Sequence, residues 1–219
     1  MKKLIIFGIG EQAEMAYYYF QNDSDYKICA FTVDKEFVDQ KTLFNLPIVA
    51  FDLIEKDYTK EEYDFFIAIG YNKINKLRTE KYLACKNKGY TIASYISSRA
   101  SILTKDIGEN CFILEDNTLQ PYVHVGNNVT LWSGNHIGHH SIIQDNCFIT
   151  SQVVISGGCE IGESTFIGVN ATLRDHIKIG TSNVIGAGAL ILSDTEDNKV
   201  YMEKGTEVSR VPSTRLRGI

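Results

Sequence analysis

The chain has 219 residues, of which 44% are hydrophobic and 22% are charged, with a formal net charge of −5. This length and composition allow a substantial core, and we expect two domains rather than one. Because lysine and arginine form no cluster, the sequence disfavours nucleic acid or an anionic membrane as the main partner and favours a small-molecule ligand.

The cysteines and the N-terminus indicate where the protein works. The apolar run after the first lysines stops after six residues, which is too short for a signal peptide or a membrane-spanning segment. The cysteines are scattered, without a CxxC pair, and are expected to be small buried residues in a reducing compartment. We therefore expect a cytoplasmic protein. The cysteines are Cys29, Cys85, Cys111, Cys147 and Cys159.

Residues 1–98 are predicted to form an α/β domain that binds a nucleotide sugar. Short apolar runs alternate with helical patterns in β-α-β order, which indicates a small parallel sheet of Rossmann-like type. The predicted strands lie at residues 3–8, 26–34, 64–70 and 91–96, and the predicted helices at 12–21 and 72–89.

Residues 99–219 follow a different pattern, with a period of six. Every sixth residue from Ile107 to Ile191 is Ile, Leu or Val, fifteen positions in all, and glycine follows seven of them. Three strands separated by sharp bends make one triangular coil, and stacked coils pair through parallel strands about 4.8 Å apart. The period predicts a parallel β-helix of about five coils, with the aliphatic residues inward. The tail after Leu192 is expected to cover its open end or to pack against a neighbour.

Together these features resemble the left-handed β-helix (hexapeptide repeat) acyltransferases of the sialic-acid O-acetyltransferase and bacterial nucleotide-sugar N-acetyltransferase group. The resemblance rests on the glycine turn IIFGIG, the VD that ends the second strand, the segment FFIAIGYNKINKLR, the hexads, and a histidine in their middle.

The resemblance implies a left-handed β-helix and a homotrimer with active sites between subunits. It also implies acetyl-CoA, or another short acyl-CoA, as donor without a metal, and a UDP-, dTDP- or GDP-linked amino sugar as acceptor. The implied reaction is N-acetylation of the sugar amine in glycan or O-antigen assembly. O-acetylation of a sugar and a non-catalytic scaffold are the alternatives.

The stretch NHIGHHSII contains three of the five histidines of the chain. By resemblance, His139 is the general base that takes a proton from the amine, a role that imidazole can fill near neutral pH. His140 stands where the family often has an acidic residue, and the two histidines could exchange roles. His124 and His136 are expected to be structural or surface residues. His176 is expected roughly 9 to 10 Å from His140, two coils further on.

A zinc site, as in hexapeptide-fold carbonic anhydrases, is the alternative for this cluster. Zinc needs three converging ligands. The neighbouring side chains of His139 and His140 are expected to point to opposite sides of a strand. The sequence therefore favours proton transfer over metal binding.

Glycines in the hexads are the candidates for acyl-CoA binding. Gly157 lies eighteen residues after His139. By resemblance, its backbone N–H is directed at the thioester carbonyl, where it would stabilise the tetrahedral oxyanion. Gly158 is needed either there or for the bend. Gly186 and Ala187 are expected to wall the CoA groove, or to permit tight stacking of coils.

A candidate nucleotide-sugar site combines three segments of the N-terminal domain. The turn after the first strand could direct N–H groups at a phosphate, although it lacks a full GxGxxG. A carboxylate ending the second strand could bind a ribose, or be an ordinary turn residue. By resemblance, the segment after the third long strand contacts the base. The candidates are Gly8, Gly10, Glu11, Gln12, Asp34, Ile69, Gly70, Tyr71 and Asn72.

Trp132, the only tryptophan, lies one residue after the hexad position Leu131. We expect its side chain to wall the acceptor pocket or to pack at the seam between subunits.

Overall fold

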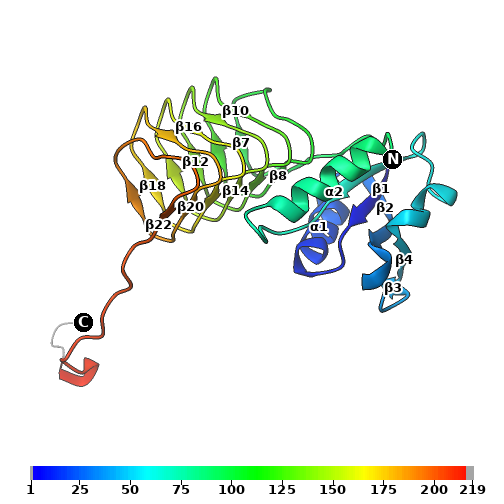
Figure 1. Cartoon of the computed structure of the whole chain (residues 1–219), viewed down its shortest axis with the longest axis horizontal. Coiled ribbons are helices and arrows are strands. Elements are labelled where there is room, and N and C mark those ends of the chain that lie inside the picture. The colour runs from blue at the N-terminus through cyan, green and yellow to red at the C-terminus, as the bar shows by residue number, and fades with distance from the viewer. Residues whose placement is uncertain (1, 216–219) are drawn as a thin grey trace.

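A computed structural model describes residues 2–215. It contains an α/β domain followed by a three-sided parallel β-helix, with the C-terminal tail leading away from the far end of the β-helix (Figure 1). The predicted fold class is confirmed.

The N-terminal domain is built on one sheet, in the strand order β3-β4-β2-β1-β5. All neighbours in the sheet are parallel except β3 and β4. Its strands are β1 (Lys2–Phe7), β2 (Tyr26–Val33), β3 (Thr42–Leu43), β4 (Leu46–Ala50) and β5 (Tyr63–Ile67). Its helices are α1 (Glu11–Asn22) and α2 (Lys76–Asn87), with short 3-10 helices η1 (Lys35–Phe37) and η2 (Phe51–Lys56).

The predicted β-α-β order is confirmed, whereas β3 and β4 were not anticipated. Residues of β1 alternate between two cores because successive side chains of a strand point to opposite faces. Leu4 and Ile6 pack in the core that contains Phe20 of α1, and Ile5 packs in the core that contains Cys85 of α2. The apolar run of β4 is short and contains Pro47, which weakens its strand signal.

The β-helix has three flat faces. The face that carries the N-terminal domain, called the docked face, consists of β6 (Tyr95–Ile96), β8 (Phe112–Ile113), β11 (Thr130–Leu131), β14 (Phe148–Ile149), β17 (Phe166–Ile167), β20 (Val184–Ile185) and β22 (Val200–Tyr201). The second face consists of β7 (Ser101–Ile102), β9 (Thr118–Leu119), β12 (His136–Ile137), β15 (Val154–Ile155), β18 (Thr172–Leu173) and β21 (Leu190–Ile191). The third face consists of β10 (His124–Val125), β13 (Ile142–Ile143), β16 (Glu160–Ile161) and β19 (Lys178–Ile179).

The hexad positions form the core of the β-helix, as predicted. Those from Ile113 to Ile191 are buried, and Ile107 packs against them partly buried. A second inward position, two residues earlier in each hexad, takes small side chains such as Cys111, Cys147 and Cys159. All five cysteines are free, and four of them are buried. The expectation that cysteines serve as small buried residues therefore holds for these four.

The two ends of the β-helix differ from the simple repeat. Residues 91–96, expected to close the N-terminal half, serve both parts, because Ile92 bridges to Phe65 and Tyr95 pairs with Phe112. At the other end, Tyr201 pairs with Ile185 and packs against the core, so the start of the tail covers the last coil as expected.

A buried arginine joins the two parts of the molecule. Arg78 of α2 is 1% exposed, and its Nη2 donates hydrogen bonds to the carbonyl oxygens of Asn128, Asn146 and Cys147. Burial lowers the pKa of its guanidinium to about 10. The guanidinium also lies 5.3 Å from the centre of the Phe148 ring. These contacts fix α2 beside the docked face.

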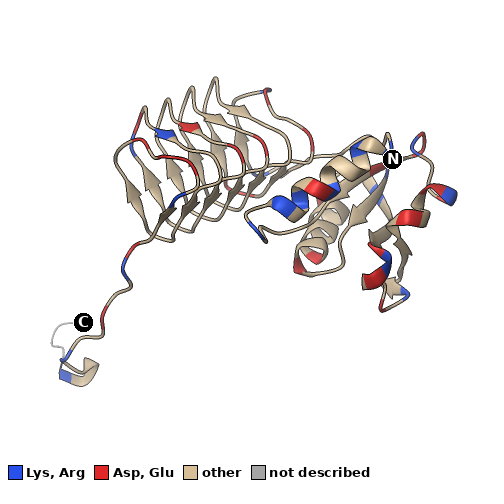
Figure 2. Ribbon diagram, in the orientation of Figure 1, with Lys and Arg blue, Asp and Glu red and all other residues tan. Residues whose placement is uncertain are grey.

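Acidic and basic residues are interspersed along the ribbon of both parts of the molecule (Figure 2). The longest helices of residues 2–215 have 12 residues and none is sufficiently long and apolar to cross a bilayer.

Candidate functional site

The corner between the second and third faces, called the histidine corner, carries unusual turn residues. From Asn110 to Asn198 the second residue of each tight turn has a positive φ, and at the other two corners this position holds Asn, Asp, Gln, Ser or Gly. At the histidine corner it holds Tyr122 (φ 66°), His140 (59°), Gly158 (69°) and His176 (56°). Small and polar residues are the common choice in this conformation. Rings here therefore suggest that the corner has a use beyond making the bend.

His139 and His140 lie side by side in one turn and contact each other. Their Nδ1 atoms are 3.0 Å apart. The backbone N–H of His139 donates to Oε1 of Gln120 at 2.9 Å, and the ring of His140 packs on that of Tyr122 with centroids 4.6 Å apart. The expectation that the two side chains point to opposite sides of a strand was wrong, because the residues form a turn and His140 has a left-handed backbone.

The contact between the two rings couples their tautomers. One Nδ1 must carry the hydrogen and the other must accept it. If His139 donates, its Nε2 keeps a lone pair and can take up a proton. If His140 donates, Nε2 of His139 carries the hydrogen instead and cannot act as a base. His140 can thus orient a base without supplying negative charge.

Gly157 lies directly against the ring of His139. A Cβ placed on Gly157 would come within 2.7 Å of Nε2 and Cε1 of that ring, so only glycine leaves the ring its position. Among the residues that the structure describes, nothing accepts a hydrogen bond from the Gly157 N–H. By contrast, the N–H groups of His139 and Glu163, at matching turn positions, bond to glutamine side chains. The Gly157 N–H is therefore free to meet a developing oxyanion beside Nε2.

Gly158 lies against another histidine. Its N–H donates to the carbonyl of His139 at 2.8 Å, and a Cβ on it would come within 2.8 Å of the ring of His176. Nδ1 of His176 lies 3.1 Å from Oδ2 of Asp175. The sequence did not place His176 in the site, because it was expected two coils away from His140, at roughly 9 to 10 Å. Its signal was the recurrence of histidine at the same corner two coils on.

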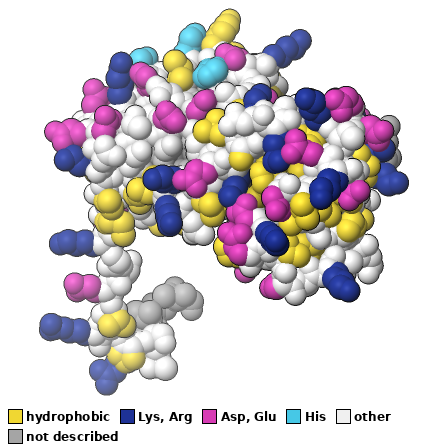
Figure 3. All heavy atoms as spheres, turned by 45° about the vertical axis from the view of Figure 1, so that its right-hand side comes forward, with side chains coloured by type: hydrophobic (Ala, Val, Ile, Leu, Met, Phe, Trp, Pro, Cys, Tyr) yellow, Lys and Arg dark blue, Asp and Glu magenta, His cyan; other side chains and the backbone are white. Residues whose placement is uncertain are grey.

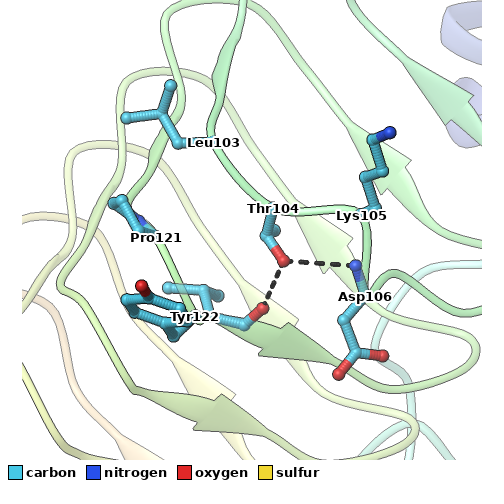
Figure 4. A pocket seen from close by; sticks show the side chains of 7 residues that line it. Leu103, Thr104, Lys105, Asp106, Pro121 and Tyr122 are labelled. Carbon is cyan, nitrogen blue, oxygen red and sulfur yellow. Dashed lines mark hydrogen bonds between the residues drawn. The ribbon is translucent and has the colours of Figure 1, made fainter.

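An open depression of about 840 Å³ lies at the start of the same corner (Figure 4). It is formed by the loop 103–106 and by Pro121, Tyr122 and Val123. The Thr104 hydroxyl inside it donates to the Val123 carbonyl at 2.7 Å. Because Tyr122 packs on His140, the depression adjoins the histidine pair on the side away from Gly157. Ligands can thus approach the pair from two sides.

Gly186 and Ala187 lie elsewhere, where the docked face meets the second face. A Cβ on Gly186 would lie 3.0 Å from the Tyr201 carbonyl, so tight stacking accounts for this glycine. Within one chain, this pair and Gly157 occupy opposite edges of the second face. A groove lined by both pairs would therefore run across that face or need a second chain.

Parts of the candidate nucleotide site come together at the carboxyl edge of the N-terminal sheet. Gly8 has a φ of +125°, and a Cβ on it would lie 2.6 Å from the Ala68 carbonyl, which requires glycine. Gly10 precedes α1 without a side-chain cap, and a Cβ on it would meet open space. Gly70 lies near the Gln12 side chain. The exposed Glu11 is in the first turn of α1, where its negative charge opposes a bound phosphate.

Two of the predicted residues have partners that the sequence did not reveal. Asp34 forms an ion pair with Lys81 of α2 at 2.5 Å, and both side chains are mostly buried. Tyr71, which follows Ile69 and precedes Asn72, contacts the rings of Phe148 and Phe166, so this loop touches the docked face.

Trp132 packs, partly buried, against the core cluster that contains α1. It therefore lies at the junction of the two parts of this chain.

The candidate nucleotide site and the histidine corner lie on opposite sides of the β-helix. The N-terminal domain covers the docked face, and the histidine corner joins the other two faces. Figure 3 shows histidine side chains along one edge of the β-helix, apart from the N-terminal domain. One chain therefore does not bring its two candidate sites together.

Comparisons with known proteins match both parts of the chain. The family model described as the PglD N-terminal domain matches residues 3–82. The model described as bacterial transferase hexapeptide (six repeats) matches residues 122–157 and 158–193.

Two solved structures share the whole fold. One is a histidine-to-asparagine mutant of perosamine N-acetyltransferase from Caulobacter crescentus in complex with CoA and GDP-perosamine, with a TM-score of 0.81, 19% identity, and 94% of this chain and 98% of that chain covered. The other is the acetyltransferase domain of PglB from Neisseria gonorrhoeae FA1090, with a TM-score of 0.79, 20% identity, and 93% and 97% covered.

A curated relative is gamma carbonic anhydrase 1 of Arabidopsis thaliana, which is 35% identical over 99 residues, covering 44% of this chain and 32% of its own length. The chain spans about a third to two fifths of the length of the first curated relatives that it matches. Within residues 2–215, no three His, Cys, Asp or Glu side chains are grouped so as to hold a metal ion. The comparisons thus show a likeness to the PglD N-terminal domain over residues 3–82 and to bacterial transferase hexapeptide repeats over residues 122–193.

Proposed function

We propose that the chain is an acyl-CoA-dependent N-acyltransferase, most simply an acetyltransferase, that acts on the amino group of a nucleotide-linked amino sugar. The observation that carries the proposal is the arrangement of His139 against Gly157, with a free backbone N–H beside Nε2. The complex of CoA and GDP-perosamine with a protein of the same fold supports the choice of ligands.

The proposed chemistry needs one base and one oxyanion donor. The sugar amine attacks the thioester carbon while Nε2 of His139 takes the amine proton. His140 accepts the hydrogen on Nδ1 of His139 and so keeps the lone pair on Nε2. The Gly157 N–H binds the oxygen that becomes negative, and no acyl-enzyme forms. Since His140 supplies no charge, the base is better matched to an amine than to a hydroxyl.

The N-terminal domain is proposed to hold the nucleotide of the acceptor. Gly10 leaves the start of α1 open to a phosphate, and the Asp34 carboxylate can accept hydrogen bonds from a ribose while Lys81 balances its charge. Tyr71 positions the neighbouring loop against the docked face. We place the reaction in the cytoplasm, the reducing compartment that five free cysteines fit.

The active site is proposed to form between subunits of a homotrimer. The N-terminal domain, which would hold the nucleotide sugar, lies on the docked face, whereas His139 lies at the opposite corner of the same β-helix. A neighbouring chain must then bring its histidine corner to the sugar. Closed rings of identical subunits build such heterologous contacts.

Incubation with acetyl-CoA and a panel of UDP-, dTDP- and GDP-linked amino sugars tests the reaction. The expected result is release of free thiol with at least one 3- or 4-amino sugar, and release at least about 100-fold slower with His139→Asn. Treatment of the product with mild alkali followed by mass spectrometry separates an amide, which persists, from an ester, which is hydrolysed. No thiol release with any amino sugar would overturn the proposal.

Mixing two inactive variants tests the shared site. His139→Asn lacks the base and Asp34→Ala lacks the nucleotide contact. In randomly mixed trimers about a quarter of the interfaces combine the two intact halves. Co-expression should therefore restore about a quarter of the activity, whereas a site contained in one chain would give no recovery.

A further inference from the structure

Two histidines of the histidine corner lie against a pair of adjacent glycines. The His139 ring lies against Gly157, with a Cβ there 2.7 Å from its Nε2. The His176 ring lies against Gly158, with a Cβ there 2.9 Å from its Nε2. The two histidines belong to the coils on either side of the glycine pair, so both rings lie against the same turn.

The spacing of the two rings suits a tetrahedral intermediate. Coils that are two steps apart are separated by about 10 Å, and inclined rings are closer than that. In the intermediate, one carbon carries both the amine nitrogen, hydrogen-bonded to the base, and the sulfur, hydrogen-bonded to the acid. Laid in line, these atoms place the nitrogens of base and acid about 9 Å apart. Gly157, whose N–H has no acceptor among the described residues, belongs to the coil between the two histidines, where the oxyanion would form.

The two histidines have different partners at Nδ1. Nδ1 of His176 lies 3.1 Å from the Asp175 carboxylate, and this hydrogen bond lowers the pKa of Asp175. The partner of His176 is therefore a charged acceptor, whereas the partner of His139 is the imidazole of His140. His176 is thus suited to be an acid and His139 to be a base.

We propose that His176 is the general acid of the acyl transfer proposed above, on which this inference rests. The amine nitrogen bonds to the thioester carbon, and its proton passes to Nε2 of His139. As the intermediate collapses, the carbon–sulfur bond breaks and the sulfur takes the proton from Nε2 of His176. The products are the amide and CoA thiol, and the two histidines exchange protons with solvent before the next turnover.

The test compares two acyl donors with His176→Asn. Asparagine suits the turn, because Asn170 adopts the same left-handed backbone one hexad earlier. Acetyl-CoA has an alkyl thiolate that leaves poorly without a proton, and the acetyl thioester of 4-nitrothiophenol has a thiolate that needs none. We expect kcat with acetyl-CoA to fall about 100-fold, and the rate with the aryl thioester to fall less than about threefold. Asp175→Asn should show the same selectivity with a smaller loss.

A matched control separates the loss of an acid from a disturbed coil. His136→Asn, on the second face, is the matched control and should keep both rates. An unchanged rate with acetyl-CoA, or equal losses with both donors, would overturn the role of His176. A wild-type protein that acylates no amino sugar would overturn the proposed function and the general acid with it.

Discussion

Two corners of the same β-helix have the same backbone bend but carry side chains with different roles. At the corner beside α2, Asn110, Asn128 and Asn146 form a buried ladder in which each amide donates to the next at 2.7 Å. At the histidine corner, His140 and His176 occupy the equivalent left-handed position and are exposed. The backbone makes the same demand at both. Side chains that bond to neighbouring coils support the fold, whereas side chains with unused nitrogens are available for chemistry.

If this comparison is right, substitutions at the histidine corner should change the catalytic rate, and substitutions beside the asparagine ladder should change the stability. The largest effect is expected for His139→Asn, with a fall in kcat of about 10² to 10⁴-fold because the base is lost. The free energy of unfolding should change by less than about 0.5 kcal/mol, because the side chain is exposed. Thiol-release kinetics and urea unfolding of the same preparation measure both. A large loss of stability would contradict the division.

The opposite result is expected for Arg78→Ala beside the asparagine ladder. It leaves the carbonyls of Asn128 and Asn146 without a donor and opens a cavity, so unfolding should require about 2 to 5 kcal/mol less free energy. The kcat of the folded fraction should stay within about twofold of wild type. Arg78→Met, which keeps the packed stem, is the matched control and should lose less stability. Equal losses for both variants would show that packing of the stem contributes little.

A smaller catalytic effect is expected for Gly157→Ala. The added methyl would lie 2.7 Å from Nε2 of His139, so the ring must move. A displacement of about 1 Å at a catalytic group costs about 100-fold in rate. Gly205→Ala, whose methyl meets open space, is the control and should be neutral. A Gly157→Ala enzyme of normal rate would refute the packing of His139 as part of catalysis.

The smallest effect concerns pH and the junction between the two parts. The Tyr95 hydroxyl and the Ser98 N–H donate to Asp23, and these bonds lower the pKa of Asp23 below its usual 3.8. A lowered carboxyl pKa contributes stability above the unfolded value that disappears as the pH falls through the folded value. Wild type should therefore exceed Asp23→Asn at pH 7 by less than about 1 kcal/mol, because solvent screens the carboxylate. The urea midpoints of wild type and Asp23→Asn should differ at pH 7 and become similar at pH 3. A difference that is the same at both pH values would contradict this.

The sequence predicted the features that follow from the six-residue period, but few of those that depend on contacts between side chains. The hexads determine which residues point inward, and an eighteen-residue offset correctly places Gly157 beside His139. The contact between His139 and His140 was missed because a rule for strands was applied to a turn.

Partners between the two parts of the chain were also beyond the pattern. The pairing of Asp34 with Lys81 joins a strand end to a helix, and Tyr71 meets Phe148 across the docked face. Such contacts depend on how two surfaces meet, and no spacing within either segment encodes this. The roles of the predicted site residues stay predictions until the variants above are measured.

His139, Gly157 and His176 lie in successive coils. The number of residues between them therefore determines whether they meet at one corner. Insertion of one hexad between His139 and Gly157 would carry every later residue to the next corner and separate the three groups, although the core pattern would remain intact. Only insertions of whole coils would return them to one corner, at a greater separation along the axis. Among descendants of this chain, insertions and deletions should therefore be tolerated at its ends and in its loops. Between these histidines, the length should change only by whole coils.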